Sequence, residues 1–300
     1  MAKRIGWARI KALINENVGT GLGTHRNWVL QASGSNAGVA QAPTTLVVGT
    51  NLDSSAKPAI VNPFAESSTK LWEFGTLLHY GDRVFRYAGI GGVAVTAGKT
   101  LQTAAAISTH RDLAVQAAAA AGARTVSVTL GGTNAVTANQ YAEGYIHIND
   151  VAGQGQLLRI KSHAAAAHST TLTLTLHDAV VTALTTSSKA DLIASAYNDL
   201  VVAPTTFTGP VVGVTAMDMS ENEFGWVQIA GPCSVLFDTN GAGGQTGELG
   251  DVVYRSDEVA GAAFGGGTAA GSADRDHQQI GTVMAINGDT DYNVVWLNHL

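Results

Sequence analysis

The hexapeptide TVSVTL at residues 125–130 and the hexapeptide TLTLTL at residues 171–176 show the clearest pattern in this chain. In both, apolar side chains alternate one by one with Thr or Ser, so the two kinds point to opposite faces of an extended strand. One face of such a strand packs in a core while the other meets water. These segments therefore predict antiparallel β-structure in the middle of the chain.

Other short segments with strand patterns lie on both sides of this region, separated by turn residues. The pair Gly81-Asp82 joins Trp72–Tyr80 to Arg83–Ala88, as expected for a tight hairpin. The remaining expected strands are Asn27–Gln31, Thr44–Val48, Val93–Ala97, Lys99–Ala106 (a strand followed by a loop), Tyr145–Asn149, Leu157–Ser162, Val211–Met217, Gly225–Ala230, Ser234–Asp238, Asp251–Arg255, Ile280–Asn287 and Asn293–Leu297. Many short strands at turn-marked spacing favour sandwiches or small barrels.

The predicted fold class is mainly β: two or three small β-barrel or β-sandwich modules, an extended N-terminal arm and few short helices. The predicted units are an arm at 1–68, a small β module at 69–124, a β module at 125–205 and a C-terminal β-barrel module at 206–300. The arm has little periodicity, so we expect contact with a neighbour to order it. We interpret Pro204–Pro210 as a linker and Gly261–Ser272 as a long loop.

The composition limits the classes of partner. Charged residues make up 13% of the chain, against roughly 25% in a typical soluble protein, which weakly indicates surface buried against neighbours. A net charge of -6 argues against a nucleic-acid-binding surface. Neither a run of 18 apolar residues nor, at Met1–Asn17, the apolar core of a signal peptide is present, so we expect no membrane partner.

No motif in the chain indicates a catalytic residue, a cofactor site or a metal site, so we expect no enzyme. The glycines of Gly19–Gly23 do not match the dinucleotide fingerprint, and phosphate-loop and nucleophile-elbow motifs are missing. His163 and His168 have the spacing of a zinc pair, but they flank an alanine turn and are expected to be solvated. The single cysteine, Cys233, is expected to be a small buried side chain.

A few large side chains are candidates for assembly contacts. Trp28 lies in the arm, where an anchor in a partner's pocket and local packing are both open alternatives. Arg83 and Arg86 surround the start of a hairpin, where a solvated face is the simpler interpretation. The candidate assembly contacts are Arg26, Trp28, Arg83 and Arg86. The other strand tryptophans, Trp72, Trp226 and Trp296, are expected in cores.

Three stretches of the chain resemble structural proteins of tailed bacteriophages that are encoded near the major capsid protein. The first comprises FGT at 74–76, YGDRVFRYA at 80–88 and AGK at 97–99; the second comprises TANQY at 137–141, GQLLRIKSH at 155–163 and residues 170–176. The third comprises PVVGV at 210–214, GWVQ at 225–228, GDV at 250–252 and IGTV at 280–283, and is similar to the small β-barrel of capsid decoration (cement) proteins. The arm before residue 70 carries no resemblance.

The resemblance implies a structural virion protein that binds the outer surface of a phage capsid and stabilises it by bridging capsid subunits. Its implied partners are the major capsid protein and copies of itself in a trimer, on the capsid exterior after assembly in the host cytoplasm. A tail, head-fibre or tube component is the alternative. A host-surface or glycan-binding module is a third class, which an exposed aromatic platform would indicate.

Overall fold

The computed structural model describes residues 28–31, 45–48, 61–238, 247–266, 277–287, 291–298 and 300, and this part of the chain is mainly β, as the sequence predicts. One sheet contains β1 (Trp28–Gln31), β2 (Thr45–Val48), β3 (Leu77–Tyr80), β4 (Arg83–Gly89), β5 (Thr100–Gln102), β12 (Val201–Val202), β13 (Val211–Thr215), β14 (Phe224–Leu236), β15 (Val252–Arg255), β16 (Ala263–Gly266), β17 (Gln279–Ala285) and β18 (Tyr292–Leu297). The other contains β6 (Leu113–Ala114), β7 (Thr125–Thr129), β8 (Tyr145–Asp150), β9 (Leu157–His163), β10 (Thr171–Leu176) and β11 (Lys189–Ile193). A single 3-10 turn, η1 (Ser108–His110), is the helical element of these residues.

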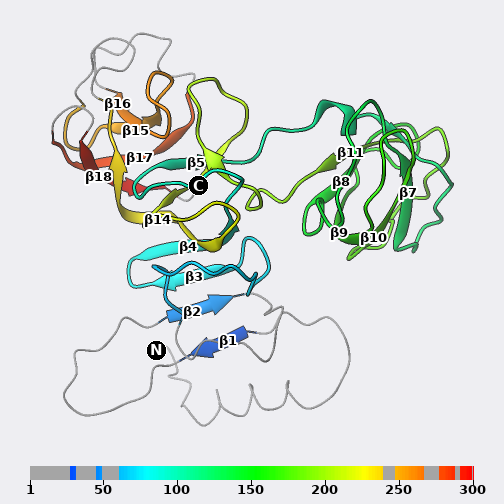
Figure 1. Ribbon diagram of the computed structural model, residues 1–300, viewed down its shortest axis with the longest axis horizontal. Helices are drawn as coiled ribbons and strands as arrows, with labels where there is room; N and C mark the ends of the chain where they lie inside the picture. The colour runs from blue at the N-terminus through cyan, green and yellow to red at the C-terminus, as the bar shows by residue number, and fades with distance from the viewer. Residues whose placement is uncertain are drawn as a thin grey trace, which may run out of the picture.

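The six-stranded sheet forms a nearly closed barrel in a lobe of its own (Figure 1). Its strand order is β6-β11-β8-β9-β10-β7, and the Gln116 N–H donates to the Ser127 carbonyl at 2.8 Å, which brings the first strand back to the last. The predicted alternation is confirmed, because Val126 of β7 pairs with Leu174 of β10 and both side chains are buried. Thr125 and Thr175 face outward, so one face of each strand fills the barrel.

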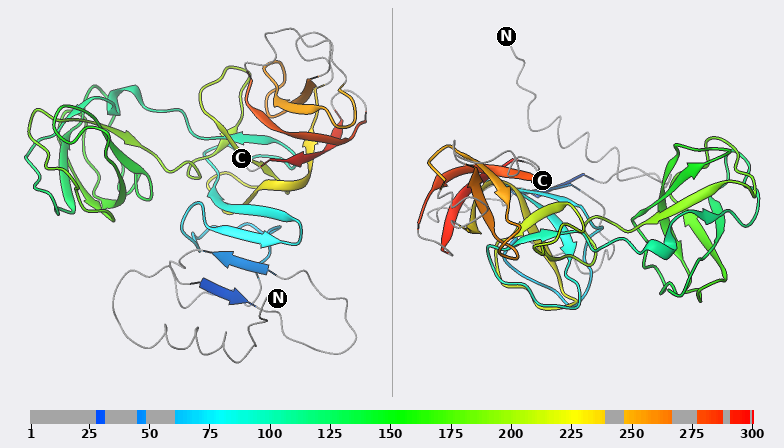
Figure 2. Two further views of the ribbon diagram at one scale, coloured as in Figure 1. Left: turned by 180° about the vertical axis from the view of Figure 1, so that it is seen from behind. Right: turned by 90° about the horizontal axis from the view of Figure 1, so that it is seen from above.

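The barrel is an insertion into the larger sheet. The chain leaves the large sheet after β5 and returns at β12, and these two strands pair with each other through Gln102 and Val201. Figure 2 shows the two connecting segments between the lobes. The predicted boundaries at 69–124, 125–205 and 206–300 are therefore wrong: residues 83–89 pair with 224–230 in one sheet. Antiparallel pairing between distant segments leaves no trace in a local period-2 pattern.

The large sheet changes direction along the 13-residue strand β14. Its first half pairs with β4 and its second half pairs with β18, on either side of Gly231. Gly231 has φ +83°, and a Cβ there would lie 2.3 Å from the Asp82 carbonyl oxygen, so only glycine fits this bend. The sequence predicts two strands, Gly225–Ala230 and Ser234–Asp238, where the structure has one bent strand.

Beyond the bend, β14, β18, β17, β15 and β16 curl into a half-barrel, whereas the sequence predicts a C-terminal β-barrel module of its own. A bridge between Phe237 and Ala263 narrows its open side. Both side chains are fully buried, with Val253 and Val295 beside them in the core. The expected loop at Gly261–Ser272 is corrected in its first part, because Ala263–Gly266 is β16. The small and aromatic side chains of this segment pack into the half-barrel core. Its many glycines nevertheless resemble a loop composition, which is why the sequence predicted a loop there.

The segment Pro204–Pro210 is a loop of the large sheet and does not link modules. It connects β12 to β13, which both pair with β5. The buried guanidinium of Arg255 donates to the carbonyls of Pro204, Thr206 and Gly209 and lies 4.2 Å from the centroid of the Phe207 ring. A buried arginine with backbone acceptors on one loop fixes that loop firmly.

Two ion pairs join the barrel to the large-sheet lobe. The cation lies on the large-sheet lobe in one pair and on the barrel in the other. Lys70 of the large-sheet lobe contacts Glu143 of the barrel at 2.7 Å, while Arg159 of the barrel contacts Glu73 at 3.3 Å. The second oxygen of Glu143 accepts the Phe74 backbone N–H at 2.6 Å. Burial lowers the pKa of Lys70, although its bond to Glu143 opposes that change. These contacts hold the lobes in a defined arrangement.

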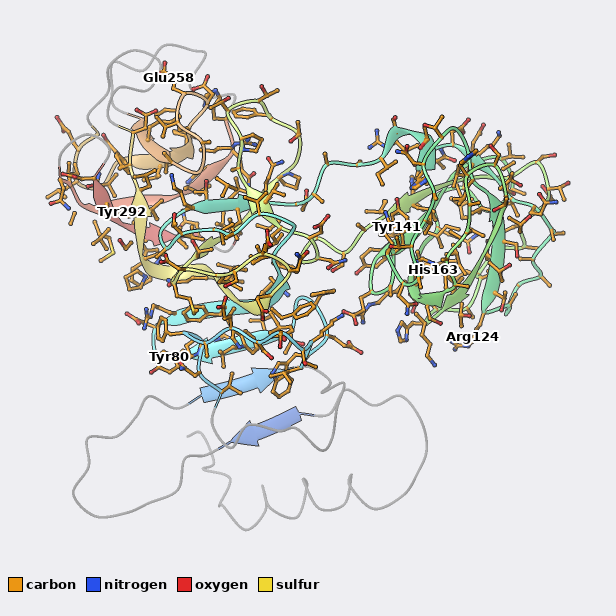
Figure 3. All side chains as sticks on the ribbon, in the orientation of Figure 1. Tyr80, Arg124, Tyr141, His163, Glu258 and Tyr292 are labelled. Atoms are coloured by element: carbon orange, nitrogen blue, oxygen red, sulfur yellow. The ribbon has the colours of Figure 1, made fainter. Side chains whose placement is uncertain are left out.

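The barrel lobe contains a buried His–Tyr–His network of His110, Tyr141 and His163. Figure 3 labels Tyr141 and His163. The geometry fits a Tyr141 hydroxyl donating to His110 Nδ1 at 2.6 Å and a Tyr141 N–H donating to His163 Nε2 at 2.9 Å. His163 is therefore buried and bonded, which corrects the expectation of a solvated side chain, whereas His168 is exposed as expected. The alternation of β9 shifts by one residue at a bulge between Ile160 and Ser162, so His163 points inward like Leu158 and Ile160. A strict period of two in the sequence does not reveal this shift.

Replacing Tyr141 with Phe should destabilise the protein. The variant keeps the ring and loses the hydroxyl that satisfies His110, which costs about 1–2 kcal/mol of unfolding free energy. Burial also raises the pKa of Tyr141 to about 12, so the folded state keeps the phenol neutral while the unfolded chain ionises near its ordinary value. This contribution is present below pH 10 and is lost between pH 10 and about 12.

Urea unfolding of both proteins at pH 8 and across that alkaline range checks this. The wild type should lose stability more steeply than the variant as pH rises. Equal unfolding free energies at pH 8 would show that the hydroxyl contributes nothing to the fold.

Candidate docking face and pocket

The outer surface of the half-barrel carries a continuous row of uncharged side chains. The row follows the register of four neighbouring strands, in which directly opposed residues share one face. From β14 through β18 and β17 to β15 it comprises Pro232, Trp296, Thr282 and Val252. The adjacent residues Cys233, Val295, Val283 and Val253 point the other way, into the core.

Further uncharged residues, most of them apolar, extend this row into a surface, which we call the docking face. It consists of Pro232, Ser234, Val252, Thr282, Met284, Tyr292, Val294 and Trp296. The relative exposures of Trp296, Tyr292 and Met284 are 43%, 45% and 47%, and none of the eight side chains is charged. Trp296 was expected in a core; it lies outside, because Val295 and Leu297 take the inward positions. Trp72 and Trp226 are buried, as predicted.

A face of this composition favours contact with another macromolecule. Single exposed apolar residues are ordinary on protein surfaces, but contiguous apolar patches mark interaction sites. Tryptophan, tyrosine and methionine are also the residues enriched at the centres of interfaces.

A pocket of about 430 Å³ opens beside this face, where β14 bends. Its lining residues are Phe64, Arg83, Thr96, Ala97, Gly98, Thr215, Ala216, Asp218, Gln228, Pro232, Cys233, Ser234 and Tyr292. The Tyr292 ring rests on Gly98, where a Cβ would lie 2.5 Å from a ring carbon. Gly98 also has φ +74°, so any side chain there would strain the turn and displace Tyr292. Figure 3 labels Tyr292 and Tyr80, which lie on the large-sheet lobe.

Arg83 is the cation of this pocket. Its guanidinium carbon lies 5.1 Å from the ring centroid of Phe64, 5.6 Å from that of Tyr80 and 5.7 Å from that of Phe85. Among the described residues it has neither a hydrogen-bond nor an ion-pair partner. The pocket's acid, Asp218, accepts the Ala97 N–H at 2.8 Å. The pocket therefore offers one preoriented cation in an otherwise neutral or weakly acidic wall.

The other candidate contacts of the sequence analysis have different positions. Arg86 donates to the Gly75 carbonyl at 2.8 Å and stacks on the Tyr197 ring at 5.3 Å, so its guanidinium serves the fold. Arg26 lies outside the described residues. Trp28 is in β1, at the end of the large sheet, and only its backbone is described. Sequence reasoning missed Tyr292 and Met284, although the alternation in 292–297 could have indicated an outward row.

A second pocket, of about 470 Å³, lies between the lobes. The two connecting segments supply most of its wall, with Arg111 and Tyr141 from the barrel and Pro210 from the large sheet. In the part of the chain that the structure describes, three or more His, Cys, Asp or Glu side chains nowhere gather closely enough to hold a metal ion.

Comparisons of the chain with protein-family models, with curated proteins and with solved structures found no match. Among the described residues no helix has the length and apolar character needed to cross a membrane.

Cys233 lies beside the first pocket with its side chain buried in the core, so it should react slowly with thiol reagents in the native protein. Burial raises the pKa of its thiol to about 12, although the nearby Arg83 charge opposes this. The thiolate fraction at pH 8 should fall roughly a thousandfold relative to an exposed thiol. Labelling with a disulfide reagent such as DTNB, before and after unfolding in guanidinium chloride, measures the difference; rapid labelling of the folded protein would contradict the buried placement.

Proposed function

We propose that this chain is a structural virion protein that binds the outer surface of a phage capsid and bridges capsid subunits. The observation that supports the proposal is the docking face: eight uncharged side chains on the half-barrel, of which Trp296, Tyr292 and Met284 are about half exposed. The sequence resemblance to capsid decoration proteins names the partner, the major capsid protein, and a trimeric assembly.

A sheet face suits this role because it is preorganised. The backbones of β14, β18 and β17 already pair with one another in the free protein. Binding therefore fixes few additional backbone torsions and costs little conformational entropy. Contacts of modest strength, repeated by the symmetry of a trimer and of a shell, then add through avidity. Shell stabilisation needs no reactive group in this scheme.

A double substitution on the docking face tests the proposal. Replacing Trp296 and Met284 with Ser removes two of the three large exposed side chains of the docking face without touching the core. We expect binding to capsids that lack this protein to weaken at least about thirtyfold, since buried aromatic anchors contribute 2 kcal/mol or more. Co-sedimentation with purified shells, together with the heat resistance of those shells, measures the effect.

The matched control is Val181→Ser. Val181 is a large apolar residue with 74% exposure, but it lies on the inserted barrel, away from the docking face. This variant should bind like the wild type. Unchanged binding of the double variant, with both variants melting as the wild type does, would refute the docking face as the capsid contact.

The edge of the large sheet favours a second candidate, a tail, head-fibre or tube component. In the described residues β1 pairs with β2 alone, so one side of its backbone remains open to a strand of another copy. Such pairing from copy to copy would build a filament.

Deleting residues 1–48, which include β1 and β2, separates the two candidates. The decoration role predicts that the full chain stays a small oligomer at high concentration, by light scattering and electron microscopy. The tube role predicts filaments that disappear on deletion. Filaments from the full chain, with no binding to shells, would replace the capsid proposal with the tube proposal.

A further inference from the structure

The pocket at the bend of β14 contains an arginine, Arg83, whose guanidinium forms neither a hydrogen bond nor an ion pair with the described residues. Three aromatic rings lie within 6 Å of the Arg83 guanidinium. The other buried or half-buried arginines differ from it: Arg86 and Arg255 bind backbone carbonyls and Arg159 binds Glu73. Within the described part of the chain, the N–H donors of Arg83 are thus available to an incoming group.

We propose that this pocket binds the carboxylate of a molecule with an aromatic or aliphatic body, and that Arg83 is the residue that receives it. A guanidinium presents a planar fork of N–H donors that matches the two oxygens of a carboxylate. Stacking on rings fixes the plane of the fork, so little side-chain freedom is lost when the acid binds. The inference does not rest on capsid binding, although the pocket shares Pro232, Ser234 and Tyr292 with the docking face.

The charge of the pocket selects the type of anion. Arg83 and Asp218 both line it, so its formal charge is zero before a ligand arrives. A monoanion placed on Arg83 leaves one net negative charge, whereas a phosphate dianion would leave two beside Asp218. A carboxylate is therefore favoured over phosphate, and the acidic chain as a whole adds to that preference.

The walls define the rest of the ligand. Phe64 and Tyr292 are partly exposed aromatic rings among the lining residues, and Pro232, Ala97 and Ala216 add apolar surface. A volume of about 430 Å³ lies in the lower part of the range for small-ligand sites, roughly 300–1,000 Å³. It accommodates a phenyl ring with a short acid chain, or an acidic or C-terminal residue and its neighbour in a peptide.

Titration with 3-phenylpropionate, followed by amide NMR shifts, tests the inference directly. We expect saturable shifts at Ala97, Ala216 and Ser234, and binding roughly tenfold weaker for the neutral 3-phenylpropionamide. Two further probes separate the sources of the carboxylate: the tripeptide acetyl-Ala-Phe-Ala with a free C-terminal carboxylate, and its C-terminal amide. Inorganic phosphate should bind more weakly than the carboxylates.

Three variants connect the binding to the pocket charges. Arg83→Gln should remove the preference for acid over amide, and Arg83→Lys should keep part of it, because lysine supplies charge without the planar fork. Asp218→Asn should tighten carboxylate binding about twofold or more, since its amide oxygen can still accept the Ala97 N–H while one negative charge is removed. Lys161→Gln is the matched control, an exposed cation of the barrel.

The outcomes are decisive in either direction. Equal affinity for acid and amide, shifts unaffected by Arg83→Gln in a variant that melts normally, or the absence of saturable shifts with every carboxylate probe would overturn the inference. A preference for the peptide acid over 3-phenylpropionate would identify a protein segment as the source of the carboxylate.

Discussion

The bend of β14 at Gly231 is the constraint on which the rest of this molecule depends. One continuous strand pairs with β4 before the bend and with β18 after it, so the flat part of the large sheet and the half-barrel share a backbone. Gly231 alone permits this, because the Asp82 carbonyl occupies the place of a side chain. The same bend exposes Ser234 and Pro232 on the outer face and opens the pocket below them. Docking face and pocket are thus two consequences of one local backbone conformation.

Much of the fold followed from period-2 patterns alone. The alternation at 125–130 and 171–176, the Gly81-Asp82 hairpin and even the short strands near residues 28–31 and 45–48 agree with the structure. Strand β11 was missed, because Ala190 is a weak apolar signal between Lys189 and Asp191. The pairing of strands was beyond prediction, because local sequence carries no record of partners that lie far along the chain. Tyr87 of β4 pairs with Trp226 of β14, and Gln102 of β5 pairs with Val201 of β12.

The site was predictable in part. Arg83 was singled out because it lies at the start of a hairpin. Two of its three aromatic neighbours belong to that hairpin, but the third, Phe64, lies outside it and could not be paired with Arg83 from the sequence. Trp296 was expected in a core because it lies within a strand pattern. The parity of β18 decides otherwise: Val295 and Leu297 are inward, so Trp296 and Tyr292 must be outward. Composition predicts how often a residue type is buried, whereas strand parity predicts which face a given residue occupies.

The inserted barrel explains why the docking face can be so poorly charged. Solubility depends on the whole surface, and the barrel's outward positions carry Thr, Lys, Arg and Asp around a closed apolar core. Because the barrel leaves and returns at the paired strands β5 and β12, its presence does not disturb the strands that form the face. Two ion pairs then fix it to the large sheet near Lys70 and Glu73, away from β17 and β18. The two lobes have separate hydrophobic cores. The fold can therefore place a charged, solvated surface on the barrel and an uncharged contact surface on the half-barrel.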